Sequence, residues 1–166
     1  TEPEYIDPSL MTGVPEHRTA LALFEGLTIE DPKDLHPIPG VAQRWISSKD
    51  GKNYTFYLRR DAKWSDGTPV TAGDFVYAWK RVLTPATGAR YAQQIYQYVK
   101  NAERYYKGET KNFAEVGVKA LDAYTLRVQL EHPTPFFLAL TAFQTYMPVP
   151  QKVVEQYGDR CTRPEH

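Results

Sequence analysis

Two stretches of alternating apolar and polar residues, each folded back on itself by a turn signal, constrain the fold of this chain most. In the first, residues 41–47 and 53–59 flank an Asp-Gly pair at 50–51, which favours a hairpin because both turn residues tolerate positive φ. In the second, residues 114–131 alternate on both sides of a predicted turn at 121–123. Two successive hairpins of this kind predict an antiparallel sheet.

Helical patterns surround the two hairpins. The clearest spans residues 71–83, where apolar residues recur at helical spacing and the pattern ends before Thr84-Pro85. Further helices are predicted at residues 17–25, 89–107, 134–145 and 151–157. The proline-rich residues 27–40 are predicted to form a long surface connection. Helices packed on an antiparallel sheet built from hairpins give the α+β class.

The stretch that joins the first hairpin to the helix at 71–83 carries dense turn and capping signals. An Asp-Gly turn is followed by proline and by a threonine three residues before an aspartate. These residues fit a tight turn, a hydrophobic staple and a capping box. We therefore assign structural rather than catalytic roles to Trp64, Asp66, Gly67, Thr71 and Asp74.

Charge and cysteine content exclude several classes of protein. Basic and acidic residues number 20 each, so the formal net charge is zero. Nucleic-acid binders usually carry a basic excess, so we expect no nucleic-acid partner. Cys161 is the only cysteine, which excludes an intrachain disulfide and a cysteine-rich zinc site. No apolar run reaches the ~20 residues that a membrane helix needs, and no signal peptide is visible.

No motif of catalytic or metal chemistry is found. The four histidines lack the spacing of a helical metal pair and are assigned to loops: His17, His36, His132 and His166. Glu30, Asp31 and Asp34 are predicted to form a solvated edge rather than a calcium site. Ser65-Asp66 lacks the strained elbow of a serine hydrolase. We expect no enzyme activity, metal or cofactor, but a hydrolase with dispersed carboxylates stays open because one sequence does not reveal carboxylate pairs in space.

The predicted helix at 89–107 is rich in tyrosine and allows two interpretations. Tyr91, Tyr98 and Tyr105 lie seven residues apart, on one stripe of that helix, and such a stripe is typical of packing. Tyrosine also suits ligand recognition, because a rigid ring carries a hydroxyl that can form hydrogen bonds. The spacing favours packing for most of them.

Several motifs, in order along nearly the whole chain, resemble one family. They are Leu23-Phe24-Glu25-Gly26-Leu27-Thr28, Pro39-Gly40-Val41-Ala42, Tyr54-Thr55-Phe56, the segment 62–71, Trp79-Lys80-Arg81 and Met147-Pro148-Val149-Pro150. The chain resembles the bacterial extracellular solute-binding proteins of the peptide class, which feed ABC importers.

The resemblance implies a piece of a larger, two-lobed receptor. Residues 1–21 would be a remnant of the first lobe, residues 22–148 the smaller extra domain, and residues 149–166 the start of the return to the first lobe. The C-terminal lobe of the same protein would be missing. Cys161 stands where the family usually has tryptophan, which suggests an altered C-terminus. The chain does not begin with Met, so we expect a processed piece of a periplasmic protein or of a lipoprotein on the outer face of the membrane.

The resemblance also implies the function and the ligand-binding residues. The family captures oligopeptides by strand-like hydrogen bonds to the peptide main chain and delivers them to the importer's membrane subunits. The corresponding residues here are Thr12, Gly13, Val14, Tyr91 and Tyr96. Relatives with the same fold bind dipeptides, nickel complexes, haem or sugars, so these ligands stay open, as does self-association of the fragment. We expect weak or no peptide binding by this chain alone.

Overall fold

The structure, a computed structural model, describes residues 6–162. The helices and strands, in chain order, are α1 (Val14–Leu23), β1 (Thr28–Glu30), β2 (Pro37–Pro39), β3 (Ala42–Ser47), β4 (Asn53–Leu58), α2 (Ala72–Leu83), α3 (Gln93–Tyr96), α4 (Ala102–Tyr106), β5 (Val118–Asp122), β6 (Thr125–Gln129), α5 (Phe137–Leu140) and α6 (Gln151–Tyr157). Residues 1–5 and 163–166 lie outside the described residues, and with them His166 and the outer ends of the predicted segments 1–21 and 149–166.

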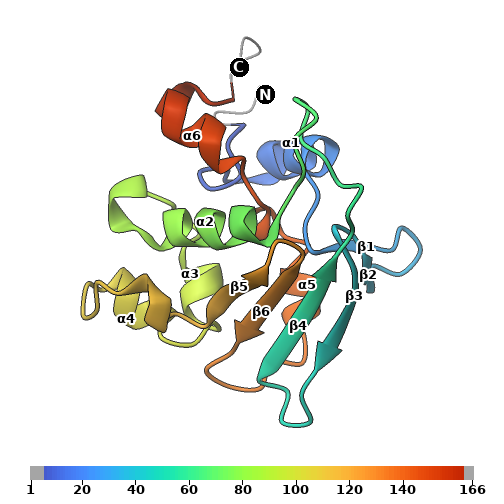
Figure 1. Cartoon of the computed structure of the whole chain (residues 1–166), viewed down its shortest axis with the longest axis vertical. Coiled ribbons are helices and arrows are strands. Elements are labelled where there is room, and N and C mark those ends of the chain that lie inside the picture. Colours follow the sequence, from blue (N-terminus) through green and yellow to red (C-terminus); the bar gives the residue numbers. More distant parts are fainter. Residues whose placement is uncertain (1–5, 163–166) are drawn as a thin grey trace.

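The four longest strands form one antiparallel sheet in the order β3-β4-β6-β5 (Figure 1). Strands β3 and β4 are the first predicted hairpin, β5 and β6 are the second, and β4 pairs with β6 to join them. Alternate residues of β4, namely Tyr54, Phe56 and Leu58, are buried against the helices, as the alternation predicts. The α+β class is therefore confirmed.

The turns of the two hairpins differ in detail from the prediction. In the first, only Gly51 of the Asp-Gly pair has a positive φ, of 67°, while the Asp50 carboxylate accepts hydrogen bonds from a hydroxyl and a main-chain N–H within the turn. In the second, strand β5 continues through Asp122, whose carboxylate accepts the N–H of Tyr124 at 2.8 Å. This side-chain-to-backbone bond places the turn later than residues 121–123.

The predicted surface connection at 27–40 was wrong, because it contains strands β1 and β2. They pair antiparallel, with Thr28 opposite Pro39 and Glu30 opposite Pro37. Strand β2 has β1 as its only partner in this two-stranded sheet, so proline's missing N–H costs little on its free side. The proline content therefore marked an edge strand rather than a loop.

Helix α1 starts at Val14, three residues before the predicted start at His17, because Pro15 is well suited to the first helical turn. The helix ends at Leu23, ahead of Gly26. That glycine has a packing role instead: a Cβ on it would lie 2.3 Å from the carbonyl oxygen of Thr141. Gly26 thus lets two backbone segments approach closely.

The single helix predicted at 89–107 was also wrong, because the chain forms the two short helices α3 and α4. Between them Val99 pairs with Leu130 as an isolated bridge, and the N–H of Lys100 donates to the carbonyl of Gln129 at 3.0 Å. Asn101 then adopts a left-handed conformation, with φ 58°. Pairing with the chain that leaves β6 therefore interrupts the helix. The helix predicted at 134–145 is similarly reduced to α5.

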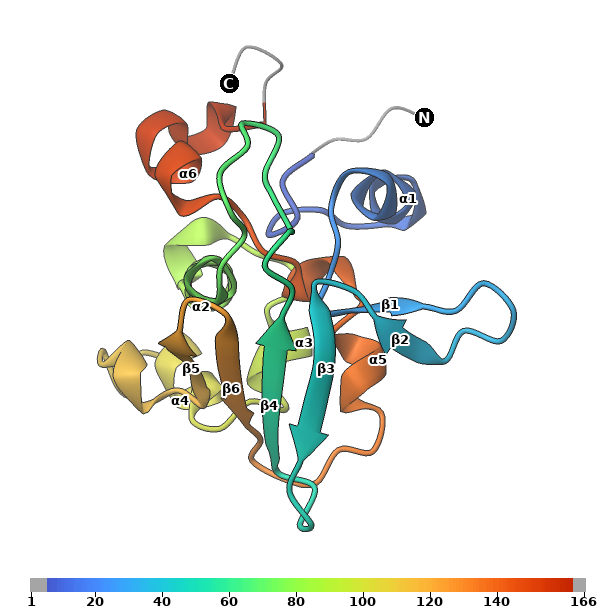
Figure 2. The same cartoon turned by 45° about the vertical axis from the view of Figure 1, so that its right-hand side comes forward.

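Helix α2 supplies the centre of the core, as its apolar stripe predicts. Phe75, Trp79 and Val82 are buried, and the Trp79 indole Nε1–H donates to the carbonyl of Tyr146 at 2.9 Å. Burial raises the pKa of Tyr146, whose hydroxyl donates to the carbonyl of Gln94. These contacts tie α2 and α3 to the segment before α6, and Figure 2 shows α3 behind the sheet and α5 beside β3.

The approach to α2 is a compact loop closed by its own hydrogen bonds. The Trp64 N–H donates to the carbonyl of Thr68 at 2.8 Å, and Gly67 has a φ of 84°. The Asp66 carboxylate accepts the N–H and the hydroxyl of Thr68, at 2.8 and 2.6 Å. The hydroxyl bond, followed by the N–H bond, lowers the pKa of Asp66. These bonds are those of an Asx-type turn.

Helix α2 then begins with a capping box between Thr71 and Asp74. The Asp74 carboxylate accepts the N–H of Thr71 at 2.8 Å and its hydroxyl at 2.9 Å. Val70 and Phe75, the staple positions on either side, are both buried in the main core. The loop at 64–71 is thus a joint between strand and helix.

Candidate functional site

The N-terminal segment is fixed to α2 by a buried ion pair. The Asp7 carboxylate lies 2.6 and 2.8 Å from two guanidinium nitrogens of Arg81, and both side chains are largely buried. Burial alone would lower the pKa of Arg81, but the bond and charge of Asp7 raise it. Asp7 also accepts the N–H of Ser9 with its side chain and that of Met11 with its carbonyl. The turn that delivers residues 12–14 is therefore built on Asp7.

Residues Thr12, Gly13 and Val14 lie at the start of α1, with main-chain groups still available. Val14 is 63% exposed, and within the described residues its N–H and that of Thr12 have no hydrogen-bond acceptor. Gly13 has a φ of 93° and a ψ of 174°, a backbone conformation that favours glycine. The Gly13 N–H donates to the hydroxyl of Tyr91 at 3.4 Å. The structure therefore brings Tyr91 to this loop across 78 residues of sequence.

An aromatic cluster that the sequence reasoning missed supports the same loop. The ring of Phe143 lies 5.5 Å from the ring of His17 and 5.8 Å from that of Tyr91. His17, assigned to a loop, lies in α1, and its Nδ1 is hydrogen-bonded to Oε1 of the buried Gln144. The Gln144 Nε2 has no partner among the described residues. No periodicity marks these residues, because they meet only through the tertiary fold.

The other tyrosines of the segment 89–107 pack against different partners. Tyr96 stacks on Tyr106 with ring centroids 4.8 Å apart. Tyr98 packs edge-on against Phe136, and Tyr105 against Phe113. Since α3 and α4 are separate helices, the predicted stripe of Tyr91, Tyr98 and Tyr105 does not exist as one helical face. Their aromatic contacts nevertheless agree with the packing interpretation.

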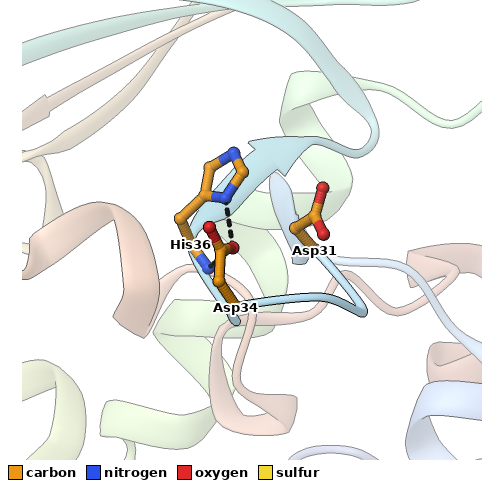
Figure 3. A group of neighbouring side chains, drawn as sticks. All are labelled: Asp31, Asp34 and His36. Carbon is orange, nitrogen blue, oxygen red and sulfur yellow. Dashed lines mark hydrogen bonds and ion pairs between the residues drawn. The ribbon is translucent and has the colours of Figure 1, made fainter.

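Of the predicted acidic group, Glu30 is the last residue of β1. Asp31 and Asp34 lie in the β1–β2 loop, where they meet His36 (Figure 3). Asp34 accepts a hydrogen bond from His36 at 2.5 Å, and that bond lowers the pKa of Asp34 and raises that of His36. Asp31 accepts the N–H of Lys33. Asp34 and His36 are exposed and the bonds fold the loop, so we assign the group to loop structure.

The family of the chain is settled by comparison with known proteins. Residues 36–165 match the family described as bacterial extracellular solute-binding proteins, family 5 Middle. The chain belongs to the family 5 solute-binding proteins. The periplasmic oligopeptide-binding protein OppA of Escherichia coli is 44% identical over 99% of this chain. OppA of Salmonella typhimurium is 46% identical over 99% of the chain.

A solved structure supports the fold over the same extent. The crystal structure of Haemophilus influenzae OppA in complex with RPPGFSPFR superposes with a TM-score of 0.94 and 45% identity. It covers 99% of this chain, while this chain covers 32% of that one. The chain likewise spans about 30% of the length of the curated OppA relatives. None of the helices in the part that the structure describes is long and apolar enough to span a membrane.

Proposed function

We propose that this chain is part of a receptor that captures oligopeptides and delivers them to the membrane subunits of an ABC importer. The observation that carries the proposal is the 44 to 46% identity to oligopeptide-binding proteins, sustained over 99% of the chain. The protein whose structure superposes with a TM-score of 0.94 holds a peptide. We assign a binding role and no enzyme activity, in the periplasm or, as a lipoprotein, on the outer face of the membrane.

We propose that the peptide main chain pairs with the exposed backbone of Thr12, Gly13 and Val14. The N–H of Val14, which has no acceptor among residues 6–162, supports this role, because an extended ligand can add to such a group as a strand does. The Tyr91 hydroxyl holds the Gly13 N–H and would fix the loop in the conformation that receives the peptide. Tyr96 stacks on Tyr106, so it would act on the ligand only indirectly.

We further propose that the chain divides as the resemblance implies, with residues 22–148 forming the extra domain and residues 1–21 and 149–166 belonging to the first lobe. A small separate cluster supports this division, because Met11 and Ala20 of the first segment are buried with Met147, beside the second boundary, and not in the main core. Leu21 and Leu23 of α1 are about half exposed. Such an uncovered apolar face fits contact with the rest of a lobe.

The mechanism that follows is closure of two lobes around the peptide, with the closed form recognised by the transporter. Main-chain pairing gives affinity without demanding a particular side chain, which suits a receptor for varied peptides. Closure would place the opposing lobe over the loop at 12–14. The half of the cleft that this chain lacks would then supply the remaining contacts.

Calorimetric titration tests the function directly. The protein produced from the complete reading frame would be titrated with RPPGFSPFR, with a dipeptide, and with a sugar. Peptide binding without sugar binding supports the proposal, whereas a receptor that takes only the dipeptide or the sugar would require another cargo. Hydrolysis of the peptide during the titration, detected by mass spectrometry, would overturn the assignment as a binding protein.

A further inference from the structure

A polar pocket lies away from the loop at 12–14. It has a volume of about 350 Å³ and is formed where Lys100 and Asn101 meet the start of β5 and the end of β6. Both views place α4 and the neighbouring end of β5 across α2 from α1 (Figures 1 and 2). The volume falls within the range of small-molecule sites. The pocket therefore has room for a ligand that the peptide surface does not involve.

Three cationic side chains line this pocket with little charge compensation. Lys100, Lys119 and Arg127 all contribute to its wall. Lys119 and Arg127 lie directly opposite each other on β5 and β6, an arrangement of like charges that is destabilising. Within the described residues, no ion pair within 4.0 Å neutralises any of the three. An anion in the pocket would relieve this repulsion.

The one carboxylate in the lining, Glu115, is already engaged with neutral donors. Its two oxygens accept hydrogen bonds from the Thr110 hydroxyl at 3.1 Å and from the Asn112 amide at 3.4 Å. Glu131, which lies outside the lining, accepts the N–H of Asn101 at 3.2 Å. Counting three cations and Glu115, the lining carries two net positive charges.

The backbone around the pocket is held in place before any ligand arrives. The Lys100 N–H donates to the carbonyl of Gln129, and its carbonyl accepts the N–H of Gly117 at 2.8 Å. A Cβ on Gly117 would lie 2.9 Å from the Cβ of Lys100, so only glycine permits this approach. Asn101 holds its left-handed conformation while its amide donates to the carbonyl of Glu115 at 2.9 Å. Such a fixed backbone is typical of a pre-organised site.

We propose that the pocket of Lys100, Lys119 and Arg127 is a binding site for a small oxyanion of the phosphate type. The Arg127 guanidinium can donate two parallel hydrogen bonds to such a group, and Lys100 and Lys119, which also line the pocket, add positive charge. The site is independent of peptide capture, because it shares no residue with the loop at 12–14.

Phosphate titration of the 166-residue chain, followed by ¹H–¹⁵N NMR at constant ionic strength, tests the proposal. Saturable shifts are expected for the amides of Lys100, Asn101, Gly117 and Lys119. Arg127→Gln should weaken the fitted affinity about tenfold or more, because it removes charge-assisted hydrogen bonds. Lys49→Gln, which removes a charge at the exposed β3–β4 turn, should leave the affinity unchanged.

The thermal midpoint provides a second readout that separates binding from folding. Without phosphate, Arg127→Gln should melt at the same temperature or higher, because it ends the repulsion from Lys119. At one phosphate concentration, the midpoint of the unchanged chain and that of Lys49→Gln should rise by similar amounts, and that of Arg127→Gln should rise less. Equal affinity of Arg127→Gln and the unchanged chain, shifts spread over all cationic surfaces, or an equal response to acetate would each overturn the proposal.

Discussion

The buried ion pair of Asp7 and Arg81 gives the sharpest test of how the N-terminal segment is held. Asp7→Ala removes two contacts of 2.6 and 2.8 Å and leaves the guanidinium of Arg81, whose side chain is 13% exposed, without its partner. Breaking a buried pair from one side costs about 3–5 kcal/mol. Because Arg81 retains some contact with water, we expect the lower end, about 3 kcal/mol.

For a chain of this length, 1 kcal/mol shifts the melting temperature by roughly 2–4 °C, so Asp7→Ala should melt about 6–12 °C lower. Thermal unfolding followed by circular dichroism measures this shift. Glu103→Ala is the control, because its ion pair with Lys107 is exposed to solvent and should contribute little to stability. In a double-mutant cycle, Asp7→Ala and Arg81→Ala should together cost less than the sum of the two. A midpoint for Asp7→Ala equal to that of Glu103→Ala would refute the reasoning.

Three further predictions follow from particular contacts. Thr71→Ala should destabilise the chain by about 1 kcal/mol, measured by urea unfolding, while Thr71→Ser should retain most of the capping. In an NMR pH series, His36 should titrate above its ordinary pKa of 6.5, and in Asp34→Asn its pKa should return toward that value. The ion pair of Asp34 and His36 stabilises the loop only at pH values above the lowered pKa of Asp34 and below the raised pKa of His36. Gly26→Ala should lower the free energy of unfolding by about 1–3 kcal/mol, because the added Cβ would clash with backbone atoms. Gly73→Ala, in the first turn of α2, should instead raise it by up to about 1 kcal/mol. Equal stability of these two variants would contradict the packing role of Gly26.

The sheet and α2 could be predicted because their signals are local. Alternation in β4 and the apolar stripe of α2 each record which face is buried, and both hairpins are short-range structures. The break at Asn101 could not be predicted in this way. It depends on Val99 pairing with Leu130, 31 residues later in the chain, and the helix propensity of neighbouring residues does not depend on so distant a partner. The strand β2 was missed for a related reason, since an edge position makes its prolines acceptable.

For the candidate site, the sequence identified the loop at 12–14 and Tyr91 only through their resemblance to family motifs. The tertiary contacts that give the loop its geometry were invisible. Asp7 reaches Arg81 across 74 residues, and His17 reaches Gln144 across 127. A buried ion pair and an aromatic contact between distant segments leave no periodic pattern, so only the folded structure could bring them together.

The central claim is that peptide pairs with the main chain at Val14, and calorimetry of two variants of the full-length protein tests it most directly. Val14 is the first residue of α1, where proline is well tolerated, so Val14→Pro removes the N–H while preserving the helix. Val14→Ala keeps the N–H and changes only the side chain. With RPPGFSPFR as ligand, Val14→Pro should weaken binding about tenfold, and Val14→Ala should stay within about threefold of the unchanged protein. Unchanged affinity in Val14→Pro would contradict the claim.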